Sequence, residues 1–290
     1  MHEVIRRMSW EGTHARAAAP ELLLTHEWLL TNALGGYASG TVAGVLTRRY
    51  HGLLIASLPA PLGRTVMLSH VSEKLEFPDD QAIQIGGGRG MDRAEEVPAT
   101  THLTEFRLEN GLPVWRYEVQ GIRLEKRLLL VHMQNTMHAT YRLLSNSGPV
   151  RLELRPLMHF RPHSAPVSMP LQEPYQLTIT GERYEISASP DFPPLRLLLQ
   201  SAEGDFTVDR ETVHSIFYQS EAERGYESQG VLWSPGYFSA ELRPGQQVTL
   251  VASTEPWTAI LALAADEAEL AEGRRRQRVL AAALPQVQMG

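Results

Sequence analysis

The 290-residue sequence contains no cysteine, which excludes disulfide bonds and thiolate metal sites. No apolar run approaches the ~20 residues that a membrane-spanning helix needs. The first residues, MHEVIRRMSWEG, also lack the apolar core of a signal peptide. We therefore predict a cytoplasmic protein that does not contact a membrane.

Motifs for metals, cofactors and nucleophilic catalysis are also missing. The eleven histidines contain neither HExxH nor HxH, and Pro162 argues against a helix that would bring His159 and His163 together. No glycine-rich loop carries the Lys-Ser/Thr of a phosphate loop, and no GxSxG occurs in a strand–turn–helix context. The sequence therefore predicts no metal, no cofactor and no catalytic residue.

The composition is that of an ordinary globular protein. Hydrophobic residues make up 43% of the chain and charged residues 21%. The net charge is −6, from 27 basic and 33 acidic residues, so there is no basic footprint for a nucleic acid. The length suits one large all-β domain or two ordinary domains.

Short apolar or alternating runs separated by turn residues fill the chain from about 21 to 253. Two of the turns, at Gln120-Gly121 and Gly181-Glu182, predict tight hairpins. About fourteen strand candidates occur, with no helical pattern between them. Consecutive hairpins imply antiparallel pairing, because parallel strands need long crossovers. The pattern predicts an all-β sandwich.

After Pro256 the composition changes to that of a helix. Residues 257–284 are rich in Ala, Leu, Glu and Arg, with acidic residues first and basic residues last, which suits the helix dipole. We expect a helix from Trp257 to Leu284, interrupted at Gly273. The helix either connects to a further domain or packs on the sandwich, and its apolar side chains favour dimer formation.

The most distinctive stretch runs from Glu27 to Leu58, EWLLTNALGGYASGTVAGVLTRRYHGLLIASL. Four glycines fall within ten residues, and large side chains between them argue against a flexible linker. Polar and aromatic groups then precede a strand. We interpret residues 32–51 as a functional loop, with a glycine-rich structural turn as the alternative. Its candidate site residues are Asn32, Gly35, Gly36, Tyr37, Arg48, Arg49, Tyr50 and His51.

A second polar and aromatic cluster lies between 218 and 238. Rings beside Arg, Glu and Gln suit a sugar, whose apolar face stacks while its hydroxyls form hydrogen bonds. An aromatic plug at one end of the sandwich is the alternative. The candidates here are Arg224, Trp233 and Tyr237. Several glutamates lie at alternating strand positions, but their surroundings single out no catalytic pair.

These motifs together resemble a known family. The stretch from Glu27 onward, the later Leu124-Glu125-Lys126-Arg127 and the segment LWSPGYF at 232–238 are similar to the N-terminal region of bacterial and archaeal glycogen debranching enzymes (amylo-α-1,6-glucosidases). The resemblance covers about residues 21–255. Ala33-Leu34 and Leu46-Thr47 depart from the usual pattern without removing a charged or aromatic group.

The resemblance implies a fold and an arrangement of domains. The fold would be a large antiparallel super-sandwich, like the N-terminal domains of glucoamylases, over residues 21–255. An N-terminal arm (1–20) would precede it, and a linker helix (256–290) would lead to an (α/α)6 barrel that carries the catalytic carboxylates. The expected partners are an α-glucan and that catalytic domain. Arg49 is expected to pair with a carboxylate or stack on a ring, and Arg48 to His51 to hold the loop.

The function that follows is a non-catalytic domain that contacts glucan and shapes the mouth of the barrel. Two alternatives remain open from the sequence. Some descriptions of the family assign a 4-α-glucanotransferase step to this region, and a free-standing carbohydrate-binding module with its own site is the other alternative. No arrangement of carboxylates in the sequence supports the transferase.

Overall fold

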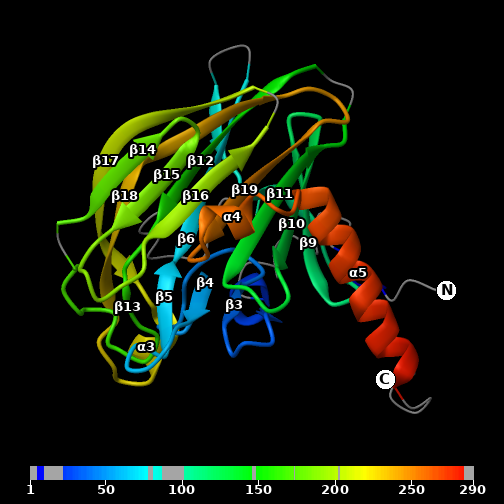
Figure 1. Cartoon of the computed structure of the whole chain (residues 1–290). Helices are drawn as coiled ribbons and strands as arrows, with labels where there is room; N and C mark the ends of the chain where they lie inside the picture. Colours follow the sequence, from blue (N-terminus) through cyan, green and yellow to red (C-terminus); the bar gives the residue numbers. More distant parts are fainter. Residues whose placement is uncertain are drawn as a thin grey trace.

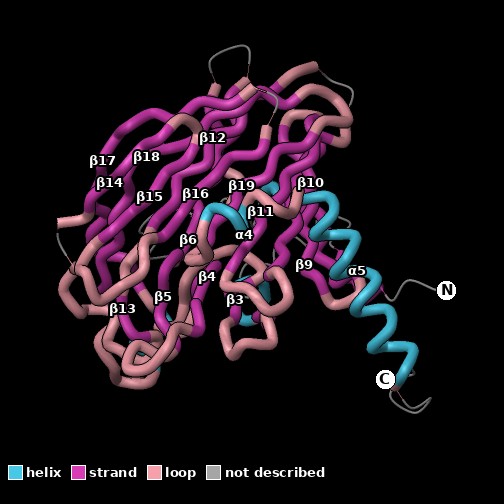
Figure 2. The backbone as a smooth tube through the Cα atoms, viewed as in Figure 1, coloured by secondary structure: helices cyan, strands magenta, loops and turns pink. Residues whose placement is uncertain are grey.

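Antiparallel sheets make up most of the protein, as the sequence predicts. The computed structural model describes residues 5–9, 22–77, 81–86, 101–145, 148–172, 174–201 and 203–283. Within these residues the strands form three sheets, and the strand pairs between named strands are antiparallel. Figures 1 and 2 show the strands stacked over most of the molecule, with the longest helix on one side.

The largest sheet, called here the nine-stranded sheet, has the order β1-β8-β9-β10-β11-β19-β16-β15-β14. Its strands are β1 (Ile5–Ser9), β8 (Leu103–Glu109), β9 (Leu112–Val119), β10 (Ile122–Leu130), β11 (Thr136–Leu143), β14 (Gln176–Thr180), β15 (Arg183–Ser187), β16 (Leu195–Gln200) and β19 (Gln247–Ser253). The strand β1 lies within the predicted N-terminal arm, and residues 10–20 of that arm lie outside the described residues.

Two five-stranded sheets complete the sandwich. The β12 sheet has the order β17-β18-β12-β6-β7, with β17 (Gly204–Phe217), β18 (Gln229–Leu242), β12 (Val150–Leu157), β6 (His70–Glu76) and β7 (Ala82–Gln84). The β4 sheet has the order β13-β5-β4-β3-β2, with β13 (Arg161–Pro162), β5 (Arg64–Leu68), β4 (Gly52–Ser57), β3 (Tyr37–Thr41) and β2 (Glu27–Thr31). The chain passes between them at Ser69, whose N–H donates to Leu157 O at 3.0 Å.

One continuous apolar core joins the three sheets. Trp28 of β2 packs edge-on against Trp115 of β9, with ring centroids 5.5 Å apart, and Trp115 Nε1 donates to Val42 O at 2.9 Å. Phe238 of β18 packs edge-on against Tyr184 of β15 at 5.0 Å. These contacts position the β4 sheet, and with it the glycine-rich stretch, at one end of the sandwich (Figure 1).

The C-terminal helices differ in detail from the prediction. A short helix, α4 (Trp257–Ile260), precedes α5 (Ala265–Ala282). The break lies before Ala265 and not at Gly273, which α5 passes without interruption. One glycine costs a helix about 1 kcal/mol, and contacts of α5 with the sheet outweigh that cost. Ile260 of α4 is buried with Leu198 and Val251, on the outer face of the nine-stranded sheet.

Two other expectations need correction. Residues 32–51 are not one loop, because Tyr37–Thr41 form β3 between β2 and β4. A short helix, α3 (Gln219–Glu223), lies inside the region predicted to be free of helix. Five residues are too few to show a helical period, so α3 cannot be recognised from the pattern of residues.

Candidate functional site

The turn between β2 and β3 is built around one buried amide. Asn32 Nδ2 donates to Gln134 O at 2.8 Å and to Asn135 Oδ1 at 3.1 Å, and its Oδ1 accepts from Leu34 N at 3.0 Å. A Cβ on Gly36 would lie 2.7 Å from Asn32 Nδ2, so only glycine fits there. Asn32 and Gly36 therefore shape the turn, and their contact with a ligand, like that of Gly35, stays a prediction.

Arg48 and His51 fix the second half of the stretch to β2. Both lie against Glu27: Arg48 Nε forms an ion pair with Glu27 Oε1, and His51 Nε2 lies 3.4 Å from the same atom. His51 Nδ1 accepts from Thr47 N at 3.1 Å, which leaves Nε2 to carry the proton. The hydrogen bond from His51, aided by Arg48, lowers the pKa of Glu27 to about 2. The predicted holding role of this segment is confirmed.

Arg49 joins the stretch to the helix α3. Its Nε lies 2.9 Å from Glu221 Oε2, and its backbone N–H donates to Glu221 Oε1 at 3.0 Å. The Glu221 side chain is 1% exposed, so Arg49 is its neutralising charge. The Arg49 guanidinium lies 4.4 Å from the ring centroid of Tyr226 and 5.5 Å from that of Tyr50. Both expected contacts of Arg49, with a carboxylate and with a ring, are confirmed.

Four rings and one guanidinium group gather at this end of the sandwich in what we call the aromatic patch, made of Tyr37, Arg49, Tyr50, His163 and Tyr226. The His163 ring centroid lies 6.3 Å from that of Tyr37 and 5.7 Å from that of Tyr50. Tyr50 is 36% exposed and Tyr226 56% exposed. The patch therefore joins three separate chain segments, two of which present an exposed ring.

Hydrogen bonds from Tyr37 and Arg161 to backbone carbonyl groups hold the patch in shape. Tyr37 Oη donates to Tyr50 O at 3.1 Å, and burial raises the pKa of Tyr37 to about 12. The buried Arg161 donates from Nη2 to Arg49 O at 2.7 Å and from Nη1 to Ala165 O at 3.2 Å. Burial lowers the pKa of Arg161. Because Arg161 binds carbonyl oxygens on both sides, it sets the distance between two of the three segments.

The structure places Trp233 and Tyr237 apart from the patch, whereas Arg224 lies two residues from Tyr226 and its N–H donates to Glu221 O. Trp233 is buried and stacks on Tyr175, with centroids 4.8 Å apart and planes at 14°. Tyr237 lies beneath the Arg155 guanidinium, 5.0 Å from it, on the outer face of the β12 sheet. Arg224 is exposed at the C-terminal end of α3. Sugar contact by these three residues stays a prediction.

Sequence reasoning missed three residues of this region. Glu221 and Tyr226 lie within the predicted cluster 218–238, but the sequence did not single them out as site residues. His163 was considered only as a metal ligand. Within the described part of the chain, no group of three or more His, Cys, Asp and Glu side chains is placed to hold a metal ion. Nor does any described helix combine the length and apolarity needed to cross a membrane.

The fold and the patch define an all-β domain with a surface suited to ring stacking. A family model described as "Glycogen debranching enzyme N terminal" matches residues 26–249. The chain belongs to this family, which confirms the resemblance seen in the sequence.

Solved structures give distant matches. A bacterial glucoamylase complexed with acarbose aligns over 89% of this chain and 36% of that chain, with 7% identity and a TM-score of 0.41. Heparan sulfate lyase HepC from Pedobacter heparinus aligns over 75% of this chain and 29% of that chain, with 10% identity and a TM-score of 0.31. This chain thus spans about a third of the length of these proteins. A comparison with curated proteins found no match.

Proposed function

We propose that this chain is a non-catalytic, glucan-contacting domain of a glycogen-debranching protein. The observation that carries the proposal is the aromatic patch, where Tyr50 and Tyr226 expose ring faces beside the Arg49 guanidinium. Sugar rings stack on such faces, and planar cations donate hydrogen bonds to hydroxyl groups. The family membership supports an α-glucan as the ligand.

Titration of maltoheptaose into the protein tests the proposal. Replacing Tyr226 by Ala should weaken binding about tenfold, since a stacked ring contributes on the order of 1 kcal/mol beyond its buried area. Val208→Ala is the matched control, because Val208 is similarly exposed (54%) but lies on β17 outside the patch. Equal affinities of the two variants would remove the patch from the binding site.

We further propose that in longer proteins the patch lies at the mouth of a catalytic barrel. The ion pair Arg49–Glu221 supports this, because it fixes the patch rigidly enough to position a chain end. In a protein that carries both parts, Tyr226→Ala should raise KM for branched glucan and leave kcat nearly unchanged. A fall in kcat alone would point to a different role.

The proposal also predicts that residues 1–290 release no glucose from a branched limit dextrin. Glu221, the most deeply buried carboxylate near the patch, is held by Arg49 and does not face an open site. Glucose release that a single Glu or Asp substitution abolishes would overturn the non-catalytic role. The cytoplasmic location stays a prediction.

A further inference from the structure

A polar groove lies between the helix α5 and the outer face of the nine-stranded sheet, on a different side of the molecule from α3 (Figure 1). Its volume is about 440 Å3. We call it the α5 groove. Glu269, Leu270 and Arg274 of α5 line one wall, and Thr140 and Arg142 of β11 line the other. A hollow of about 330 Å3 continues it, and Arg142 is common to both, so the space suits an extended ligand.

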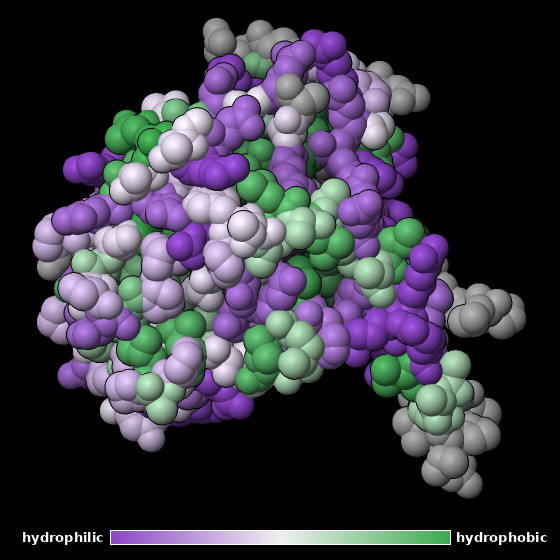
Figure 3. Space-filling view, in the orientation of Figure 1, coloured by the Kyte–Doolittle hydropathy of each residue, from purple (hydrophilic) through white to green (hydrophobic). Residues whose placement is uncertain are grey.

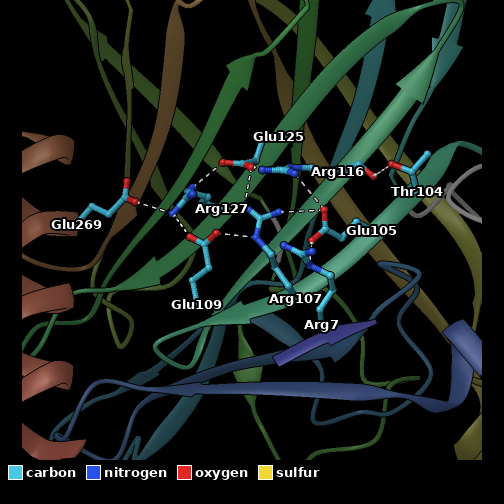
Figure 4. A network of polar contacts seen from close by, with 9 residues as sticks. All are labelled: Arg7, Thr104, Glu105, Arg107, Glu109, Arg116, Glu125, Arg127 and Glu269. Atoms are coloured by element: carbon cyan, nitrogen blue, oxygen red, sulfur yellow. Dashed lines mark hydrogen bonds and ion pairs between the residues drawn. The ribbon is translucent and has the colours of Figure 1, made fainter. Parts of the chain in front are cut away.

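Three carboxylates of the groove, Glu109, Glu125 and Glu269, are held in place by arginine (Figure 4). Arg127 Nη1 lies 2.6 Å from Glu109 Oε2 and 3.0 Å from Glu269 Oε1, while Arg127 Nε lies 2.8 Å from Glu125 Oε1. Each carboxylate oxygen has further lone pairs that can accept from a ligand. These acceptors are therefore fixed before any ligand arrives.

Three side-chain donors of the groove are unused. Within the part of the chain that the structure describes, the side chains of Arg142, Arg274 and Gln277 form no hydrogen bond or ion pair. Arg142 lies opposite Glu125 in the β10–β11 register, but Glu125 is already shared by three other arginines: Arg107, Arg116 and Arg127. The groove thus combines unused donors with fixed acceptors.

The charged side chains of the groove indicate what kind of ligand it can bind. Carboxylates and guanidinium groups line the groove in similar numbers: Glu109, Glu125, Asp266 and Glu269 against Arg127, Arg142 and Arg274. Such a lining favours neither an anion nor a cation. A hydroxyl group both donates and accepts, so it matches both kinds of partner. Leu270, 55% exposed, offers an apolar contact for C–H groups. Figure 3 shows hydrophilic residues gathered along α5.

We propose that the α5 groove is a second carbohydrate-binding site, which takes a neutral oligosaccharide along α5. The ligand bridges α5 and the sheet, so binding restrains the helix. This site stands independently of the aromatic patch, because no residue is common to the two. Two weak sites on one domain would bind a branched glucan more tightly than either alone.

The test uses maltoheptaose with the whole chain and four proteins: wild type, Tyr226→Ala, Arg142→Ala/Arg274→Ala and the control Arg278→Ala. The two groove arginines have no partner that their removal would leave unpaired, so the fold should survive. Arg278 is also exposed on α5 but does not line the groove. Binding is followed by calorimetry and by hydrogen exchange of amides 265–282.

We expect the Tyr226→Ala variant still to bind maltoheptaose. This binding should still slow hydrogen exchange of the α5 amides. The double variant should weaken this binding about tenfold and abolish the slowing, whereas Arg278→Ala should behave as wild type. If maltoheptaose protected α5 equally well in the double variant, the groove would not be the binding site. The proposal would also fail if pyrophosphate protected the α5 amides from exchange and maltoheptaose did not, because that result would identify an anion-binding site. If only the proposed role of the aromatic patch is wrong, the Tyr226→Ala variant will bind maltoheptaose with the affinity of the wild type.

Discussion

At the scale of single residues, the pairing of Arg49 with Glu221 decides whether the patch exists. Replacing Arg49 by Ala leaves a carboxylate that is 1% exposed without its charge partner. We expect a loss of about 3 kcal/mol in the free energy of unfolding, measured by urea denaturation, because breaking a buried pair strands the other charge.

The matched control for Arg49 is Arg48→Ala. The Glu27 side chain, the partner of Arg48, is 35% exposed and keeps its contact with His51, so the loss should stay below about 1 kcal/mol. Equal losses for the two variants would mean that Glu221 is stabilised by something other than Arg49.

Gly236 is required by close backbone approach. A Cβ at this position would lie 2.0 Å from Thr207 O and 2.8 Å from Asp209 N, at a φ of +145°. Gly236→Ala must therefore push β17 away from β18, and we expect thermal unfolding to show a loss of about 3 kcal/mol or more. Gly245→Ala has a positive φ but open space around it, and should lose only about 1 kcal/mol.

At the scale of elements, an ion network ties β1, β8, β9, β10 and α5 together (Figure 4). Glu125 is its centre. Burial alone would raise the pKa of Glu125, but hydrogen bonds and charge from Arg107, Arg127 and Arg116 lower it to about 2. A lowered pKa means that this stabilisation is complete above about pH 4.5 and is lost as the pH falls toward 2.

Glu125→Gln tests the network through pH. The variant should have a lower free energy of unfolding than wild type near neutral pH. This difference should shrink by on the order of 3 kcal/mol as the pH falls from about 4.5 to 2. Urea unfolding across this range measures the gap. Glu118→Gln, at an exposed position on β9, should follow the wild-type pH dependence. A gap that is constant with pH would exclude Glu125 as the titrating group.

The two halves of α5 should differ in stability. The first half is held by the buried Ala265, Ala268 and Glu272, and by a hydrogen bond from Ala265 N to Gln200 Oε1 at 3.1 Å. Val279 in the second half is 59% exposed. Hydrogen exchange should therefore be fast for amides 276–282 and slower for 268–273. Uniform exchange along α5 would contradict this division.

At the scale of the whole molecule, the second half of α5 carries exposed apolar side chains. Figure 1 shows its last turns extending away from the sheets, and Val279 and Leu280 there are exposed. We propose that two copies pair through α5 in antiparallel orientation, which sets the acidic first half of each helix against the basic second half of the other.

Sedimentation at increasing concentration measures this pairing. Wild type should shift toward a dimer, and Val279→Glu should remain monomeric, because a charge in an apolar contact costs more than the contact gains. Leu29→Glu is the control, since Leu29 is 63% exposed on β2, away from α5. Dimers that persist in Val279→Glu would place the interface elsewhere.

The sequence by itself determined the sheets and several of their turns. The turn Gln120-Gly121, with φ of 49° and 80°, joins β9 to β10 as predicted, and Gly181-Glu182 joins β14 to β15. These features depend on neighbours within a few residues, where alternation and turn chemistry act. The family was also readable, because its motifs are continuous stretches of chain.

Only the tertiary structure decided the site. Arg49 contacts a carboxylate 172 residues away, and His163 reaches Tyr37 and Tyr50 from the turn that follows β13, the edge strand of the β4 sheet. Nothing local to these residues sets such distances. They follow from how three sheets share one core, and the free energy that fixes them is gained over the whole packed interior rather than within any one segment.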